Sequence, residues 1–172
     1  MSFSRFKNMT LDEASEILKE FRENGHRYLP EFVADFDLDF SLARLPAFME
    51  WIALRLNTIA IKENPAVPQF IRESRSHKSG LYEFTLKSNG LIIGSAYYLG
   101  ECFIRSYPSL KWSIGNPEFA LRMMPVVTGF GHQKELAVLV VTENLLRRRI
   151  ENPEKSCVFE NAIQVWMNSV VT

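Results

Sequence analysis

Apolar residues at the start of the chain recur three or four positions apart, as on one face of a helix. Thr10 and Glu13 have the spacing of a capping box, in which each side chain bonds to the backbone N–H of the other residue. Gly25 is placed to end the helix in a left-handed conformation. The pattern therefore predicts a helix over about residues 11–24.

The next segments also have helical signals. Pro30 can occupy the first turn of a short helix that runs to Phe36, because its missing N–H would have no partner there. An apolar stripe behind Ser41 predicts a longer helix over about residues 42–61. Pro46 is compatible with that helix only near its start, because proline inside a helix removes a hydrogen bond.

The run from Leu81 to Tyr107 contains no proline and is apolar in its middle, so it predicts a central buried helix with a possible break at Asn89-Gly90. Each of its glycines, at positions 90, 94 and 100, costs about 1 kcal/mol of helix propensity relative to alanine. We therefore expect another element to pack closely against the glycine face of this helix.

The pattern changes after Pro108. Lys111–Ile114 alternates and residues 125–130 are rich in β-branched side chains, so both predict strands of a small antiparallel sheet. Residues 138–141 fit a strand or a helix, and the period that continues beyond them favours a helix over about residues 140–151. A last helix is predicted over residues 157–171, capped by Ser156.

These elements predict a helix-rich α+β fold, with five or six helices packed around a small antiparallel sheet. The chain has 172 residues, of which 47% are hydrophobic and 23% charged. Domains usually contain about 100 to 200 residues, so we expect one domain that spans residues 1–172. This composition excludes global disorder, because enough apolar surface can be buried to offset the loss of chain entropy.

Charge excludes further classes of protein. Twenty basic and twenty acidic residues cancel, which leaves no overall field to hold nucleic acid or an anionic membrane. Three arginines at 147–149 complement the dipole at a helix C-terminus. The longest uncharged stretch, Ser88–Gly100, is shorter than the roughly 20 residues that cross a bilayer, and Arg5 and Lys7 stand where a signal peptide is apolar. We expect a soluble cytoplasmic protein.

The residues that usually carry metal or redox chemistry are few. Cys102 and Cys157 lie in apolar runs and are expected to be buried free thiols. The histidines His26, His77 and His132 are far apart and form no spaced metal pair, so no metal or cofactor is expected. A nucleophilic pair of Cys102 with a histidine stays open, although an apolar helix would raise the pKa of this thiol.

Acidic residues gather in the first part of the chain. Residues 1–50 carry ten acids and six bases. Glu31, Asp35, Asp37 and Asp39 form an acidic segment that predicts a surface for a cationic protein partner, with a merely solvated face as the alternative. The spacing of the three aspartates resembles the start of a calcium loop, but the glycine and glutamate that such a loop needs are absent.

Glu101 is a carboxylate inside an apolar run. Arg105 lies one helical turn further on and could pair with it. A structural ion pair is the first interpretation. The alternative is a pocket beside the sheet in which Glu101 acts as a general acid or base, with Tyr97 or Tyr98 nearby and Trp112 at the start of the next strand.

Two segments carry a resemblance to a known group of proteins. Asp39–Trp51 resembles a helix start with aspartate, an aromatic residue and serine followed by spaced leucines. Gly94–Arg105, followed by Trp112, resembles a Tyr-Leu-Gly-Glu helix that leads into a tryptophan strand. Both are similar to a loose group of small bacterial cytoplasmic proteins, some of which resemble immunity proteins encoded beside polymorphic toxins. Pro46 and Pro108 depart from that pattern.

The resemblance implies a non-enzymatic inhibitor that binds and neutralises a cognate bacterial toxin effector, with the acidic segment as its contact surface. Two alternatives stay open: a small enzyme with Glu101 as its acid or base, and an adaptor or structural subunit that uses exposed aromatic residues of the last helix, including Trp166. A cavity around Glu101 would favour the enzyme, whereas an apolar surface on the last helix would favour the adaptor.

Overall fold

Helices form most of the described chain. The structure is a computed structural model that describes residues 9–29, 36, 38–60, 82–118, 123–155 and 157–170. The α-helices in these ranges are α1 (Leu11–Asn24), α2 (Leu45–Ala53), α4 (Leu86–Ser106), α5 (Val138–Glu151) and α6 (Val158–Met167). Two short 3-10 helices are η2 (Gly25–Tyr28) and η4 (Gly131–Gln133).

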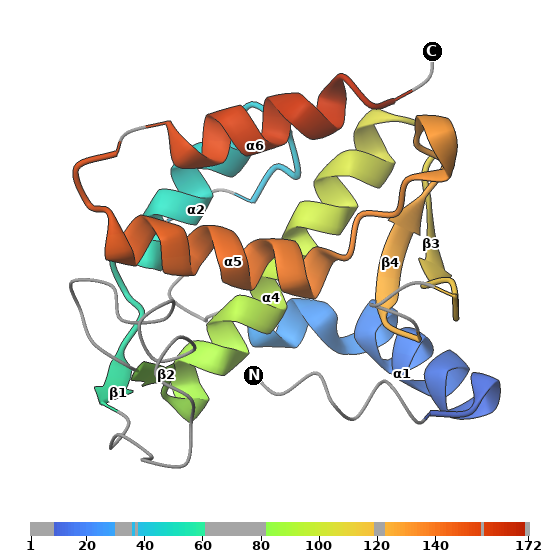
Figure 1. The fold of residues 1–172 in the computed structure, drawn as a ribbon, viewed down its shortest axis with the longest axis horizontal. Helices are drawn as coiled ribbons and strands as arrows, with labels where there is room; N and C mark the ends of the chain where they lie inside the picture. The colour runs from blue at the N-terminus through green and yellow to red at the C-terminus, as the bar shows by residue number, and fades with distance from the viewer. Residues whose placement is uncertain are drawn as a thin grey trace.

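Two small antiparallel sheets accompany the helices. β1 (Thr58–Ala60) pairs with β2 (Tyr82–Phe84), and β3 (Lys111–Ile114) pairs with β4 (Pro125–Thr128). Figure 1 shows the two sheets at different ends of the molecule, with α4 between them and α5 and α6 side by side in front. The predicted helix-rich α+β class is confirmed, with the strands divided between two sheets.

The predicted first helix is confirmed with both of its bounds. Its capping box is complete: Thr10 N–H donates to Glu13 Oε2 at 2.8 Å, and Glu13 N–H donates to Thr10 Oγ1 at 3.3 Å. The expected left-handed end is wrong, because Gly25 has φ −56° and continues into η2. Glycine is required there for space, since an added Cβ would lie 2.5 Å from the Tyr97 ring.

The predicted helix over residues 42–61 is too long. α2 ends at Ala53, and Thr58–Ala60 instead forms β1, whose Thr58 pairs with Phe84 of β2. The backbone N–H of Leu54 still donates to the carbonyl of Glu50, but Arg55 donates to Ile52 instead, in a turn that ends the helix. The β-branched residues at 58 and 59 are favourable in a strand. Pairing with β2 therefore outweighs the helical spacing of the apolar residues in this segment. The helix predicted from Pro30 lies outside the described residues.

The central helix begins five residues later than predicted and is unbroken. Tyr82–Phe84 alternates buried and exposed positions as β2. Thr85 then caps α4 by accepting the Ser88 N–H at 3.2 Å. The helix continues through Asn89-Gly90 without interruption to Ser106.

The glycines of α4 have the predicted close neighbours. A Cβ at Gly94 would lie 2.6 Å from the backbone of Tyr28, and one at Gly100 would lie 2.0 Å from the Trp112 ring. η2 and β3 therefore approach the helix more closely than any side chain would allow. Gly90 differs, because its added Cβ would make only an ordinary contact of 3.9 Å with Tyr28.

The two C-terminal helices were predicted within a few residues. α5 starts at Val138, so the strand alternative for residues 138–141 is wrong, and Leu136 just before it bonds to Val127 of β4. The last helix is shorter than predicted. Its N-cap residue is Cys157, with a left-handed backbone at φ 67°, whereas the predicted cap Ser156 lies outside the described residues.

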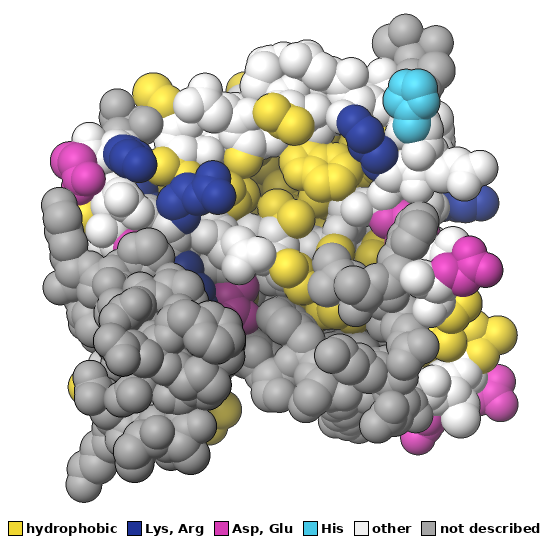
Figure 2. Space-filling view, viewed as in Figure 1, with side chains coloured by type: hydrophobic (Ala, Val, Ile, Leu, Met, Phe, Trp, Pro, Cys, Tyr) yellow, Lys and Arg dark blue, Asp and Glu magenta, His cyan; other side chains and the backbone are white. Residues whose placement is uncertain are grey.

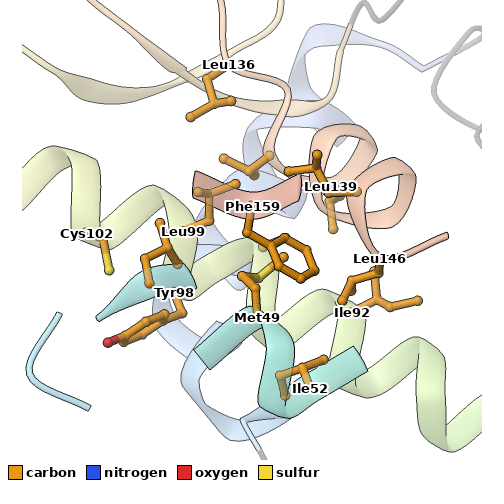
Figure 3. Packing of buried hydrophobic residues seen from close by; sticks show 14 of the residues in the cluster. Met49, Ile52, Ile92, Tyr98, Leu99, Cys102, Leu136, Leu139, Leu146 and Phe159 are labelled. Carbon is orange, nitrogen blue, oxygen red and sulfur yellow. The ribbon is translucent and has the colours of Figure 1, made fainter. Parts of the chain in front are cut away.

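One hydrophobic cluster includes residues from every α-helix, and α4 is its centre. Figure 3 shows the Phe159 ring of α6 among Leu99 of α4, Met49 of α2 and Leu139 of α5. Phe159 and Met49 are almost completely buried. Full burial of such a side chain contributes about 1.5 to 3 kcal/mol, so the last helix is anchored to the rest of the core through this aromatic ring.

Two of the arginines at 147–149 contact other elements, which the dipole interpretation did not predict: Arg149 joins α5 to α2, and Arg147 packs on β2. Arg149 Nε donates to both carboxylate oxygens of Glu50 on α2, at 2.8 and 2.9 Å. The Arg147 guanidinium donates to Glu143 and lies 4.5 Å from the centre of the Phe84 ring. None of the helices in the described ranges is long and apolar enough to span a membrane.

Alanine should have opposite effects on stability at Gly94 and Gly90, two of the three glycines of α4. Gly94→Ala should lower the free energy of unfolding by about 1 to 3 kcal/mol, because the new methyl group must push the Tyr28 backbone away. Gly90→Ala is the matched control, and its better helix propensity should raise stability by up to about 1 kcal/mol. Urea denaturation measures both values, and equal effects of the two substitutions would contradict the close-approach interpretation.

Candidate functional site

The residues predicted to share a pocket do lie together. Tyr97, Glu101 and Arg105 follow one another at four-residue intervals along α4, and Trp112 of β3 packs beside them. Of the predicted partner-binding residues, Asp39 is described and is exposed, whereas Glu31, Asp35 and Asp37 lie outside the described residues. All four residues of the predicted pocket are thus described, whereas only one residue of the predicted acidic surface is.

Glu101 accepts a bond on each of its carboxylate oxygens. The indole Nε1–H of Trp112 donates to Oε1 at 2.9 Å, and Arg105 Nε donates to Oε2 at 3.1 Å. Only 17% of the Glu101 side chain is exposed, compared with 52% for Arg105. A buried carboxylate is costly unless it is bonded, and these two donors satisfy it. Glu101 thus links α4 to β3.

Aromatic rings close the space around this carboxylate. The Trp112 ring stacks on Tyr97, with the ring centres 6.5 Å apart and the planes 9° from parallel. Phe21 of α1 meets both rings edge to face, at 5.5 Å from Trp112 and 6.1 Å from Tyr97. The Trp112 ring also lies directly against Gly100. The predicted pocket is therefore filled by packed side chains from three elements.

Arg105 continues the network on the other side. Its guanidinium lies 3.8 Å above the centre of the Phe40 ring, and the Phe40 ring lies 4.9 Å from that of Tyr98. Phe40 has φ 54°, an uncommon conformation for a residue other than glycine. These contacts fasten the segment before α2 onto α4, so Arg105 joins the carboxylate to a strained turn.

Two tyrosines and a cysteine near Glu101 are held in their neutral forms. Burial, and then the charge of Glu101, raise the pKa of Tyr97 above its usual value. Burial raises the pKa of Tyr98 and brings that of the Cys102 thiol to about 12. Cys102 is therefore a protonated thiol at neutral pH, as predicted, and is a poor nucleophile.

The prediction that both cysteines are buried is half wrong. Cys102 is fully buried on α4, whereas Cys157 is exposed at the start of α6. The apolar sequence around Cys157 suggested burial, but the residue precedes the buried positions of α6 as its N-cap, with a left-handed backbone. The described part of the chain holds no group of three or more metal-binding side chains.

Asp39 has a structural role of its own. Its Oδ1 accepts the backbone N–H of Ser41 at 2.9 Å, and its Oδ2 accepts the Ser41 hydroxyl at 2.9 Å. The backbone bond lowers the pKa of Asp39 below its usual value. This carboxylate therefore stabilises the turn that precedes α2, and a charge reversal there would disturb the turn together with any partner contact.

Two surface features were not assigned by sequence reasoning. The first is a row of exposed carboxylates on α1, for which the signal was the four-residue spacing of Asp12, Glu16 and Glu20. The second is the aliphatic part of an apolar arc on α6. The sequence predicted exposed aromatic residues on this helix, which is wrong because Phe159 is buried and Trp166 is half-buried, whereas Val165 is exposed. Both features bear on binding rather than catalysis.

Comparison of the chain with models of protein families, with curated proteins and with solved structures found no match in any of the three sets. The arguments about its function therefore rest on the contacts, exposure and charge of its own residues.

The hydrogen bond between Glu101 and Trp112 should be measurable as a coupling energy. Glu101→Met and Trp112→Phe each leave one buried polar group without its partner, whereas the double substitution removes both. The double variant should be about 1 to 3 kcal/mol more stable than the sum of the single effects predicts. The matched control is the pair Glu101→Met with Arg105→Met, whose coupling should stay below about 1 kcal/mol because Arg105 is half exposed. Equal couplings would contradict the assigned roles.

The two thiols should differ sharply in reactivity. In the native protein at neutral pH, a thiol reagent such as a disulfide dye should modify Cys157 alone, because Cys102 is buried and its pKa is raised to about 12. Cys102 should react only after denaturation. Counting modified thiols by mass spectrometry measures this, with Cys157→Ser as the control that should show no rapid reaction. Modification of both thiols in the folded protein would refute the assignment.

Proposed function

We propose that this chain is a non-enzymatic protein-binding inhibitor that covers the active surface of a cognate bacterial toxin effector. The observation that carries the proposal is the exposed acidic face of α1. At about 100° of rotation per residue, five carboxylates fall within an arc of about 100° on this helix. All five side chains are exposed: Asp12, Glu13, Glu16, Glu20 and Glu23.

The acidic face has different neighbours on its two sides. Half-buried Ile17 adjoins it on one side, whereas the exposed bases Lys19 and Arg22 lie on the other. Ala14 and Phe21 on the same helix are buried against the core. An open hollow along the first turns is lined by carboxylates and apolar atoms together. Its lining residues are Met9, Asp12, Glu13, Ser15, Glu16 and Ile17. Such a mixture suits a protein surface that presents both cations and apolar contacts.

Charge on this face would act mainly on the rate of encounter. Complementary charge steers a partner and raises the association rate, with a strong dependence on salt. An inhibitor that must reach a toxin before the toxin acts benefits from fast association. The acidic face of α1 supplies this property from described residues.

The Glu101 network supports the same proposal by removing the main reason for an enzyme. The enzymatic alternative rested on a buried carboxylate with no evident structural purpose. Trp112 and Arg105 provide that purpose, because they bond to both oxygens of Glu101.

The proposal is tested with the product of the gene that adjoins the gene for this chain. If that product is the toxin, its expression should arrest growth, and co-expression of this protein should restore growth. The variant Glu16→Lys/Glu20→Lys/Glu23→Lys should lower the association rate by about 10-fold or more at low salt, with little effect on folding because these side chains are exposed. Surface plasmon resonance at several salt concentrations measures the rate.

The control reverses two exposed acids away from α1 and α6, as Glu83→Lys/Glu118→Lys, and is compared with the double variant Glu16→Lys/Glu20→Lys, so that the net charge changes equally. Equal loss in both double variants would assign the effect to net charge and remove the acidic face of α1 from the interface. Absence of both binding and growth rescue with the wild-type chain would refute the inhibitor function itself.

A further inference from the structure

The last helix carries more apolar surface than the core uses. At about 100° per residue, its apolar positions span an arc of about 200°, but only Phe159 and Ile163 are buried. Val158, Ala162 and Trp166 are half-buried, and Val165 is 63% exposed. A surface helix that packs on one side usually needs a narrower stripe.

The surplus surface is concave. Figure 2 shows an apolar hollow in the region where Figure 1 places α6 beside α5. Trp166 is held by an edge contact with Phe130, with the ring centres 5.1 Å apart, and so keeps a fixed position. On α5, Val141 is half-buried and Leu145 one turn further is 9% exposed. The two helices thus flank a groove whose walls are already ordered.

The border of this groove is basic. Figure 2 shows Lys and Arg side chains on both sides of the apolar hollow. On α5, Arg148 is exposed two turns after Val141, on the same face of the helix. Lys155 is exposed in the connection between the helices, next to the exposed acid Glu154, and exposed Lys134 donates to Ser169 just beyond the end of α6. The neighbouring acids Glu143 and Glu50 are already bonded to Arg147 and Arg149.

We propose that the α5–α6 groove is a docking site for an amphipathic helix of another protein, whose apolar face fills the hollow and whose flanking carboxylates meet Arg148, Lys155 and Lys134. A helix in a groove presents apolar side chains at spacings of three and four residues, which suits an elongated apolar surface between two helices. This surface is distinct from α1 and attracts the opposite charge. It therefore adds a second partner contact to the proposed function.

The basic border also favours an acidic helix over a second copy of this chain as the bound partner. In a symmetric pair of two copies the same patch would meet itself. The exposed Arg148 and Lys155 of one copy would then approach those of the other, and juxtaposed like charges oppose binding. A helix with acidic flanks experiences the reverse effect.

The test uses two synthetic helical peptides of about four turns with the same leucine stripe, one flanked by glutamates and the other by lysines. Fluorescence anisotropy of labelled peptide measures binding to the full-length protein. The glutamate peptide should bind about 10-fold or more tightly than its lysine twin at low salt. Val165→Asp should weaken that binding about 10-fold, and Arg148→Glu/Lys155→Glu should invert the preference between the peptides.

Leu54→Asp is the matched control, because Leu54 is 78% exposed on a different helix end, and it should leave binding unchanged. Circular dichroism checks that each variant is folded. Because Val165 is exposed, Val165→Asp should leave the fold intact. Both peptides are also measured against Glu16→Lys/Glu20→Lys/Glu23→Lys, which removes binding of the lysine peptide to the acidic face of α1. Equal binding of the two peptides to that variant, or glutamate-peptide binding unaffected by Val165→Asp, would overturn the proposal. A dimer seen by sedimentation that disappears in Val165→Asp would also overturn it, because the occupant would then be a second copy.

Discussion

The close approach of neighbouring elements to the glycine face of α4 is the constraint on which the rest of the structure depends. Gly94 admits the backbone of Tyr28, and Gly100 admits the ring of Trp112. Each glycine weakens the helix by about 1 kcal/mol relative to alanine, and the contacts that follow offset this cost. η2 and β3 can lie on α4 only because no Cβ separates them.

The hydrogen bond of Glu101 is a consequence of that approach. Once the Trp112 ring lies on Gly100, its indole N–H is buried and needs an acceptor, and Glu101 is the next residue along the helix. The carboxylate in turn needs a second donor, which Arg105 supplies one turn later while covering Phe40. The Gly-Glu pair and the distant tryptophan therefore form one unit, in which packing and polar satisfaction require each other.

The sequence could predict the contacts within one helix but not those between distant elements. Local signals specified the first helix, because Thr10 and Glu13 cap it without help from other elements, and the pairing of Glu101 with Arg105 followed from spacing on one helix. The bond from Trp112 could not be derived, because it joins residues across a turn whose path depends on packing. The same limit explains residues 58–60, where pairing with β2 outweighs a helical pattern. The exposure of Cys157 likewise could not be derived, because burial depends on which neighbouring elements cover the residue.

The equal numbers of acids and bases conceal a separation of charge that matters for binding. Five carboxylates gather on one arc of α1, whereas the bases Arg148, Lys155 and Lys134 border the groove between α5 and α6. A chain without net charge has no long-range preference for either sign, so each face acts only on a partner that comes within roughly a Debye length, about 8 Å at physiological salt. Selectivity must then arise locally, from the apolar side chains beside each charged face. Ile17 beside the acids and Val165 beside the bases are placed to provide it.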